Sequence, residues 1–219
     1  MVNQEAKTPR ERYRAQVRTE IKERAWEQIA TAGASALSLN AIAKQLGMSG
    51  PALYRYYAGR DELITELVGD AYRSLAGTLR AAFSRPGADV STLASALRTW
   101  ALEDPQRYFL IFGTPVPGYH APDDITAIAS EVMTTILDAF TGLPSSSTAT
   151  AFDAHLEQHR DWADGHPAPA ATLHRALTFW TRLHGVLSLE LAGHFTGMGF
   201  DPARFYAAEL DEVTGLGRM

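Results

Sequence analysis

The chain has 219 residues, with 20 Lys and Arg against 25 Asp and Glu, and it contains no cysteine. The lack of cysteine excludes disulfides, thiolate metal sites and a cysteine nucleophile. No run of about eighteen uncharged apolar residues is present, and the first residues lack the apolar stretch of a signal peptide, so we expect a cytoplasmic protein that does not enter a membrane.

Charge is distributed unevenly along the chain. Residues 1–60 hold ten of the 20 Lys and Arg but only five of the 25 acidic residues, whereas residues 61–219 hold the other ten bases and twenty acids. A basic head on an acidic body indicates that the head meets a polyanion such as DNA. A basic segment that only stays hydrated is the alternative.

The apolar residues recur three and four positions apart, with little strand-like alternation, and this spacing predicts helices from the start of the chain. The first helix is expected over 12–31, and Gly33 is expected to end it. Its buried stripe should consist of Val17, Ile21, Ala25, Ile29 and Ala32. Two short helices are then expected over 39–46 and 50–57.

The remainder of the chain is also predicted to be helical. A long helix over 60–83 should carry Asp61 and Glu62 in its first turn, where the helix dipole favours acids. Further helices are expected over 90–102, 106–112, 123–140, 152–162, 170–195 and 201–214. We therefore predict an all-α protein with two domains, residues 1–60 and residues 61–219.

Residues 38–57 carry the most informative pattern in the sequence. The first short helix has an apolar face made of Leu39, Ile42, Ala43 and Leu46, and the second has Leu53 and Tyr57, four positions apart. Ser38 and Ser49 are suited to cap the two helices, and Gly47 to form the sharp turn between them. Two short helices joined by about three residues indicate a helix-turn-helix, whose second helix lies in the DNA major groove.

The outward side of these helices has the chemistry of a DNA-reading surface. Arg55 is suited to bond guanine bidentately, and Tyr54 and Tyr56 offer hydroxyls and ring edges to phosphates and thymine methyls. Lys44 and Arg60 lie at helix ends or outer faces that suit phosphates. The predicted DNA-binding residues are Ser38, Lys44, Ser49, Gly50, Pro51, Ala52, Tyr54, Arg55, Tyr56 and Arg60.

From about Glu20 to Val68 the chain resembles the TetR family of transcriptional regulators. The likeness includes the Leu-Tyr-x-Tyr-Tyr signature at 53–57 and the basic residue that starts the next helix, and it departs from the family at Pro51, where a small residue is more usual. The resemblance implies a three-helix head, a connecting helix and a larger helical effector domain. It also implies a homodimeric repressor that binds an inverted-repeat operator and pairs through its last two long helices.

The segment 170–195 is apolar nearly all round, so it must be buried. A subunit interface and an intrachain core are both compatible with this pattern. Within the C-terminal part, residues 104–112 and the Trp-x-x-x-His-Gly sequence at 180–185 are similar to a subgroup of the TetR family.

Aromatic and soft apolar residues of the C-terminal part are suited to line a pocket for a small, largely apolar effector with a few polar anchors. The candidates are Trp100, Tyr108, Phe109, Phe112, Met133, Trp162, Trp180 and His184. Plain core packing is the alternative for each of them. Such an effector would release DNA by binding one conformation better than another.

Two other classes of function stand as alternatives. His155 and His159 lie four apart, a spacing that can hold a metal, but Glu does not directly follow the first His as in the metalloprotease pattern, and a hydrated charged helix explains them better. No catalytic triad context, phosphate loop or dinucleotide glycine pattern is visible, so we expect no catalytic residues, no metal and no cofactor. A DNA-binding protein that needs no effector is the other alternative.

Overall fold

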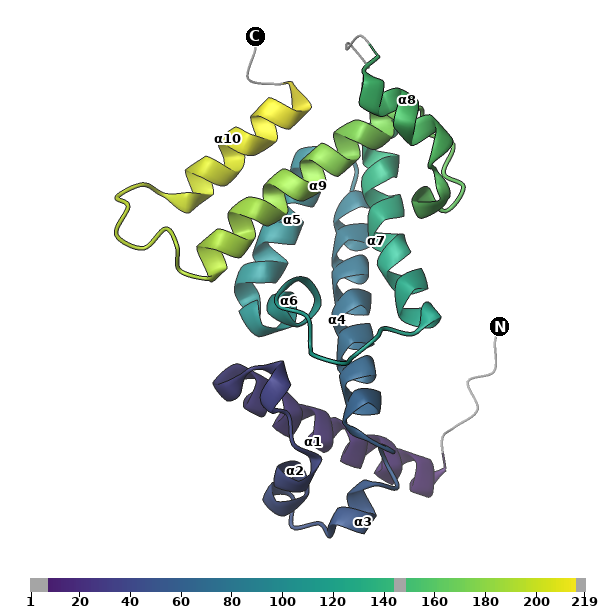
Figure 1. The fold of residues 1–219 in the computed structure, drawn as a ribbon, viewed down its shortest axis with the longest axis vertical. Helices are drawn as coiled ribbons and strands as arrows, with labels where there is room; N and C mark the ends of the chain where they lie inside the picture. The colour runs from purple at the N-terminus through teal and green to yellow at the C-terminus, as the bar shows by residue number, and fades with distance from the viewer. Residues whose placement is uncertain (1–7, 144–148, 216–219) are drawn as a thin grey trace. The chain divides into compact units, whose positions relative to one another are not determined.

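The computed structural model describes residues 8–143 and 149–215, and Figure 1 shows their course. The described residues form ten α-helices and two short 3₁₀ turns, and no strand occurs among them. The prediction of an all-α protein is confirmed. Contacts divide the chain into two compact units, one made of residues 1–70 and 114–122 and the other of residues 71–113 and 123–219.

The first unit combines one long helix and two short helices with the first half of a second long helix. It contains α1 (Pro9–Ala32), a 3₁₀ turn (Ala34–Ala36), α2 (Leu39–Gln45), α3 (Gly50–Leu53) and the start of α4 (Arg60–Phe83). Thr8 and Glu11 form a capping box that begins α1 three residues earlier than predicted. Four of the five predicted stripe residues of α1 are buried, but Ala32 is exposed because α1 ends there and Gly33, at φ 79°, turns the chain away.

The second short helix is shorter than the sequence predicts. α3 ends at Leu53, and residues 54–56 continue as turns in which the amides of Tyr56 and Tyr57 both donate to the carbonyl of Leu53. Leu53 and Tyr57 are nonetheless fully buried, as the four-residue spacing predicts. A tight turn therefore buries the same two side chains that a regular helix would have buried.

The second unit is built around α9. It contains the second half of α4, then α5 (Val90–Glu103), α6 (Pro105–Phe112), α7 (Asp123–Thr141), α8 (Ala151–Gln158), α9 (Ala170–Leu191) and α10 (Pro202–Thr214). Helix α9 packs against α10, α8, α7 and α5, and Figure 1 shows α9 and α10 running side by side. Leu97, Phe140, Phe179 and Leu183 lie fully buried at the centre of this unit.

Two predicted helices of the second unit are too long. The helix expected over 152–162 ends at Gln158, and a separate 3₁₀ turn (Asp161–Ala163) follows. The helix expected over 170–195 ends at Leu191, and the chain then turns at Gly193, which has a φ of 78°. Apolar residues continue past that turn as far as Phe195, which explains why periodicity alone extended the helix.

Candidate DNA-reading site and effector cluster

Local hydrogen bonds shape the helix-turn-helix of residues 38–57, which we call the reading segment. Ser38 Oγ accepts from the amide of Ala41 at 3.3 Å, and Ser49 Oγ accepts from the amide of Ala52 at 3.3 Å, so both predicted caps are confirmed. Gly47 has a φ of 64°, a left-handed conformation that favours glycine. These features fix the geometry of the turn between α2 and α3.

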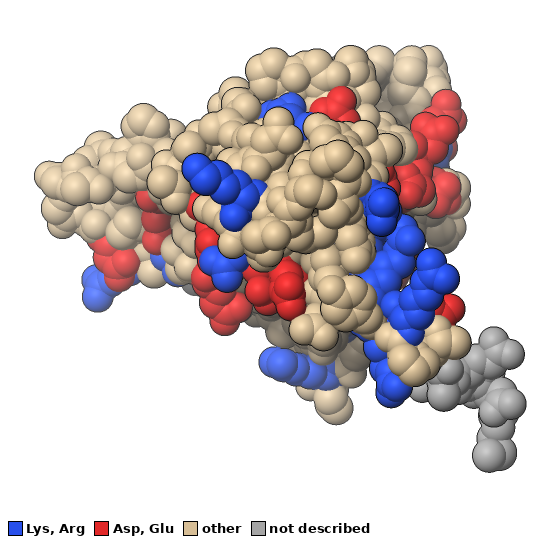
Figure 2. Space-filling model, turned by 90° about the horizontal axis from the view of Figure 1, so that it is seen from below, with Lys and Arg blue, Asp and Glu red and all other residues tan. Residues whose placement is uncertain are grey.

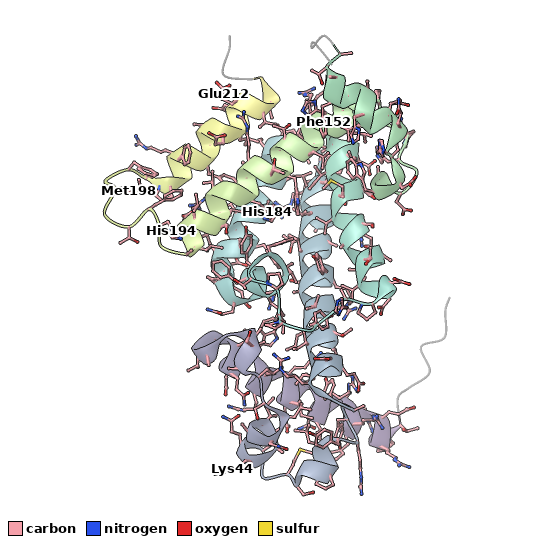
Figure 3. The ribbon with its side chains drawn as sticks, viewed as in Figure 1. Lys44, Phe152, His184, His194, Met198 and Glu212 are labelled. Atoms are coloured by element: carbon pink, nitrogen blue, oxygen red, sulfur yellow. The ribbon has the colours of Figure 1, made fainter. Side chains whose placement is uncertain are left out.

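The side chains predicted to meet DNA lie mostly on the surface. Lys44, Ser49, Pro51, Tyr54 and Arg55 are exposed, and Lys44 extends from the outer side of α2 in Figure 3. The remaining members are half-buried: Ser38, Gly50, Ala52, Tyr56 and Arg60. The surface therefore presents a cation and an aromatic hydroxyl, Arg55 and Tyr54, next to each other.

Basic residues of α1 hold the backbone directly behind those two side chains. Arg14 donates to the carbonyl oxygen of Arg55 at 3.3 Å, and Arg18 donates to the carbonyl oxygen of Tyr56 at 2.8 Å. The Arg18 guanidinium also lies over the ring of Tyr57, 4.3 Å from its centroid. From the sequence, Arg14 was expected to reach a neighbouring DNA groove or phosphate backbone, and Arg18 only to contribute to the basic head.

Arg18 also belongs to a cluster of charges between α1 and α4. It pairs with Glu66, and Lys22 Nζ lies 3.1 Å from Glu66 Oε1 and 2.7 Å from Asp70 Oδ2. Burial alone would raise the pKa of Glu66, but hydrogen bonds from Arg18 and Lys22 lower it below the ordinary value. Glu66 is therefore held as a carboxylate between two cations.

Arg60 is engaged inside the first unit. Its guanidinium donates to the carbonyl oxygens of Ala34 at 2.9 Å and Ser35 at 3.2 Å, in the 3₁₀ turn after α1. These bonds use donors that the sequence led us to expect at phosphates.

Figure 2 shows the surface seen from below, where Lys and Arg side chains gather in a band along one flank, beside the beginning of the described chain.

In the second unit, five of the eight predicted effector residues lie together. His184 on α9 (Figure 3) lies with its ring centroid 3.9 Å from that of Trp180 and 4.4 Å from that of Phe112. Tyr108 stacks on the same imidazole at 5.5 Å and meets Phe109 edge-on at 5.6 Å. Burial lowers the pKa of His184 to about 4, so the ring is neutral at physiological pH.

The other three predicted effector residues lie outside this aromatic cluster and have other surroundings. Trp100 on α5 is buried, and its indole N–H donates to Ser74 Oγ at 3.1 Å. Met133 on α7 and Trp162 in the 3₁₀ turn after α8 are half-buried against the core. The indole of Trp100 thus has a structural partner, whereas Nε2 of His184 is buried without a hydrogen-bond partner among the described residues.

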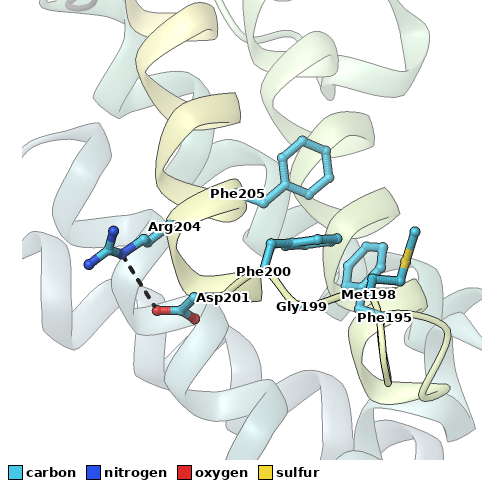
Figure 4. A pocket seen from close by; sticks show the side chains of 7 residues that line it. All are labelled: Phe195, Met198, Gly199, Phe200, Asp201, Arg204 and Phe205. Carbon is cyan, nitrogen blue, oxygen red and sulfur yellow. Dashed lines mark ion pairs between the residues drawn. The ribbon is translucent and has the colours of Figure 1, made fainter.

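A hollow of about 870 Å³ opens where α9 connects to α10. Figure 4 shows Phe195, Phe200 and Phe205 gathered around it with Met198, while Arg204 and Asp201 lie at its edge. Met198 is 61% exposed, Phe200 43% and Phe205 39%. No role was predicted for these residues from the sequence.

The alternative metal site rested on His155 and His159. Their rings stack 4.1 Å apart, and Nδ1 of His159 lies 2.9 Å from the carbonyl oxygen of His155. Within residues 8–143 and 149–215, no three His, Cys, Asp or Glu side chains are grouped as metal ligands would be.

None of the helices in the described part of the chain is long and apolar enough to cross a membrane.

Comparison with known proteins extends over both units. Residues 21–67 match the family of bacterial regulatory proteins of the tetR type, and residues 90–213 match the tetracyclin repressor-like C-terminal domain. The HTH-type transcriptional regulators Mb1846 of Mycobacterium bovis and Rv1816 of Mycobacterium tuberculosis are each 36% identical over 211 residues, which cover 90% of this chain and 90% of theirs.

Solved structures show the same likeness. The crystal structure of the regulatory protein SCO4313 is 71% identical, with a TM-score of 0.88 over 95% of this chain and 100% of that one. A protein from Rhodococcus sp. RHA1, 19% identical, shares the fold with a TM-score of 0.66 over 98% of each chain. The regulator PfmR from Thermus thermophilus, 15% identical, shares it with a TM-score of 0.56 over 89% of this chain and 97% of that one.

Proposed function

Because the chain belongs to the TetR family of helix-turn-helix transcriptional regulators, we propose that it is a homodimeric repressor that a small, largely apolar ligand releases from an inverted-repeat operator. One observation carries the DNA-reading part of this proposal. The exposed side chains of Tyr54 and Arg55 project from a turn whose backbone is held by Arg14 and Arg18. A rigid backbone with free side chains is what base recognition requires.

On DNA, α3 and the turn after it would enter the major groove. Arg55 would bond guanine bidentately, and Tyr54 would contact a neighbouring base or phosphate. Lys44, Ser38, Ser49 and Tyr56 would meet the flanking phosphates, while Gly50, Pro51 and Ala52 would lie closest to the bases. We assign Arg60 to holding the 3₁₀ turn, since its guanidinium already donates to Ala34 and Ser35.

The dimer would form through α9, α10 and the connection between them. Large apolar side chains are exposed along this stretch: Leu189 at 45%, Met198 at 61%, Phe200 at 43% and Phe205 at 39%. Exposed apolar area of this kind marks a surface that binds another protein. A two-fold dimer would place two reading segments in successive major grooves, roughly 34–36 Å apart, and so require an inverted repeat.

The ligand would contact the cluster of Tyr108, Phe109, Phe112, Trp180 and His184. Aromatic rings supply the apolar wall, and the neutral imidazole, whose Nε2 is unpartnered among the described residues, supplies a polar anchor. Ligand binding would release DNA only through a difference in affinity between two conformations.

Selection of DNA from a random pool, at a stated salt concentration, tests the proposal. The expected result is an inverted repeat, bound less tightly after Arg55→Ala and after Tyr54→Ala while helicity and dimer mass are unchanged. Arg85→Ala is the control, since this exposed arginine lies outside the basic head of residues 1–60. Binding that shows no sequence preference would contradict the proposal.

A further inference from the structure

Four charged side chains join α1 to α4 within the first unit. Arg18 and Lys22 lie four residues apart on α1, and Glu66 and Asp70 lie four residues apart on α4, so each pair shares one face of its helix. Glu66 accepts from both cations, and Lys22 bridges both acids. We call these four residues the α1–α4 clamp.

The clamp also reaches the reading segment. Arg18 donates one bond to Glu66 and another, at 2.8 Å, to the carbonyl oxygen of Tyr56. Its guanidinium covers the ring of Tyr57, which is fully buried. One side chain therefore connects α4 to the backbone that lies one residue after Arg55.

The clamp is only partly exposed to solvent. The side chains of Arg18, Lys22 and Glu66 are only 29%, 24% and 22% exposed. Partly buried charges are screened less by salt, and a planar guanidinium can bridge two acceptors in a fixed geometry. Helix α4 then continues unbroken to Phe83, so a displacement of α4 would move Glu66 directly.

We propose that Arg18 and Glu66 are positioning residues for DNA reading, because together they fix the backbone at Tyr56 relative to α4 without touching DNA themselves. This inference rests on the proposed function, since it presumes a selected operator. It removes Arg18 and Lys22 from the cations available to phosphates. It also makes α4 the element whose position sets the orientation of Tyr54 and Arg55.

Glu66→Gln separates positioning from simple electrostatics by the sign of its effect. Removing a negative charge from a DNA-binding unit strengthens DNA binding if only the overall field matters. If Glu66 instead positions Arg18, Glu66→Gln removes the charged partner of Arg18. Binding to the selected operator then weakens by about tenfold, which corresponds to one charge-assisted bond. Glu23→Gln, at an exposed position on α1, removes the same charge outside the clamp and serves as the control.

Arg18→Lys tests the same inference while the charge is kept. Lysine lacks the planar fork with which the Arg18 guanidinium places separate N–H groups on the Tyr56 carbonyl and the Glu66 carboxylate. Operator binding therefore falls, while binding to non-operator DNA and its salt dependence stay at the wild-type level. Lys44→Gln behaves differently, because loss of a phosphate contact weakens both kinds of DNA alike and lowers the salt slope by about 1.

Each result decides between the explanations. Circular dichroism and thermal unfolding identify the temperature at which every variant is folded, and binding is measured there. Operator binding by Glu66→Gln that equals or exceeds that of Glu23→Gln, or wild-type operator binding by Arg18→Lys, overturns the inference. A wild-type protein that selects no operator overturns the proposed function instead, so the two failures are distinguishable.

Discussion

The hydroxyl oxygen of Tyr108 lies 2.9 Å from Nδ1 of His184 and 3.2 Å from the carbonyl oxygen of the same residue. A hydroxyl has one proton, so both contacts are full hydrogen bonds only if the hydroxyl donates to the carbonyl and accepts from Nδ1–H. The geometry therefore favours the Nδ1–H tautomer, with Nε2 as a bare acceptor. A ligand with a hydroxyl or N–H donor would satisfy that atom.

Replacing Tyr108 by phenylalanine removes the acceptor of the His184 Nδ1–H bond. We expect Tyr108→Phe to lower the free energy of unfolding by about 1–3 kcal/mol, because a buried polar group loses its partner. Urea unfolding measures the change. Tyr13→Phe, at a position that is 65% exposed, is the control and leaves the midpoint in place. Equal midpoints for both variants would contradict the assigned bond.

The pKa of His184 predicts how stability depends on pH. Burial lowers it from 6.5 to about 4 in the folded protein. Between these values the unfolded chain binds a proton that the folded chain does not, so stability falls as pH drops from about 6.5 to about 4 and levels off below. The wild type should lose on the order of 3 kcal/mol more than His184→Gln over this range. Parallel stability curves from urea unfolding at each pH would refute this.

The cap of α3 supports the reading segment. Ser49→Ala should lower the free energy of unfolding by about 1 kcal/mol, because the amide of Ala52 loses its side-chain acceptor. Ser49→Asn keeps a capping oxygen, so its free energy of unfolding should stay close to that of the wild type. Thermal unfolding of both variants measures the difference. If asparagine destabilises the protein as much as alanine does, the hydrogen bond is not the reason.

The proposed dimer surface predicts a difference between two side chains of equal exposure. Phe205 on α10 and Leu102 on α5 are both 39% exposed. Phe205→Glu should shift the mass measured by light scattering from dimer to monomer, because it places a charge in an apolar interface. Leu102→Glu should leave the mass unchanged. A dimer that survives Phe205→Glu would place the interface elsewhere.

Local signals predicted much of the fold and the outline of the reading segment. Serines at 38 and 49 and glycine at 47 act on neighbouring backbone, so their roles follow from adjacent residues alone. The four-residue spacing of Leu53 and Tyr57 likewise predicted their burial, although α3 ends before the second of them.

Contacts between distant residues were not predictable in the same way. Arg18 and Glu66 are 48 positions apart, and no motif that contains either residue indicates that they meet. Their shared spacing with Lys22 and Asp70, four residues on each helix, is the one signal that the sequence offers. Five aromatic candidates on α6 and α9 do meet, but the composition that selected them also selected Trp100, whose indole bonds Ser74 instead.

Arg14 and Arg18 hold the reading segment through the main-chain carbonyl oxygens of Arg55 and Tyr56, and their guanidinium groups also lie over the rings of Tyr56 and Tyr57. A carbonyl oxygen is present whatever residue occupies positions 55 and 56, so these bonds place no demand on the side chains there. Support and recognition are thereby separated in the chain. A regulator built this way can acquire a new operator by exchanging Tyr54 or Arg55 while the same arginines keep the segment in place.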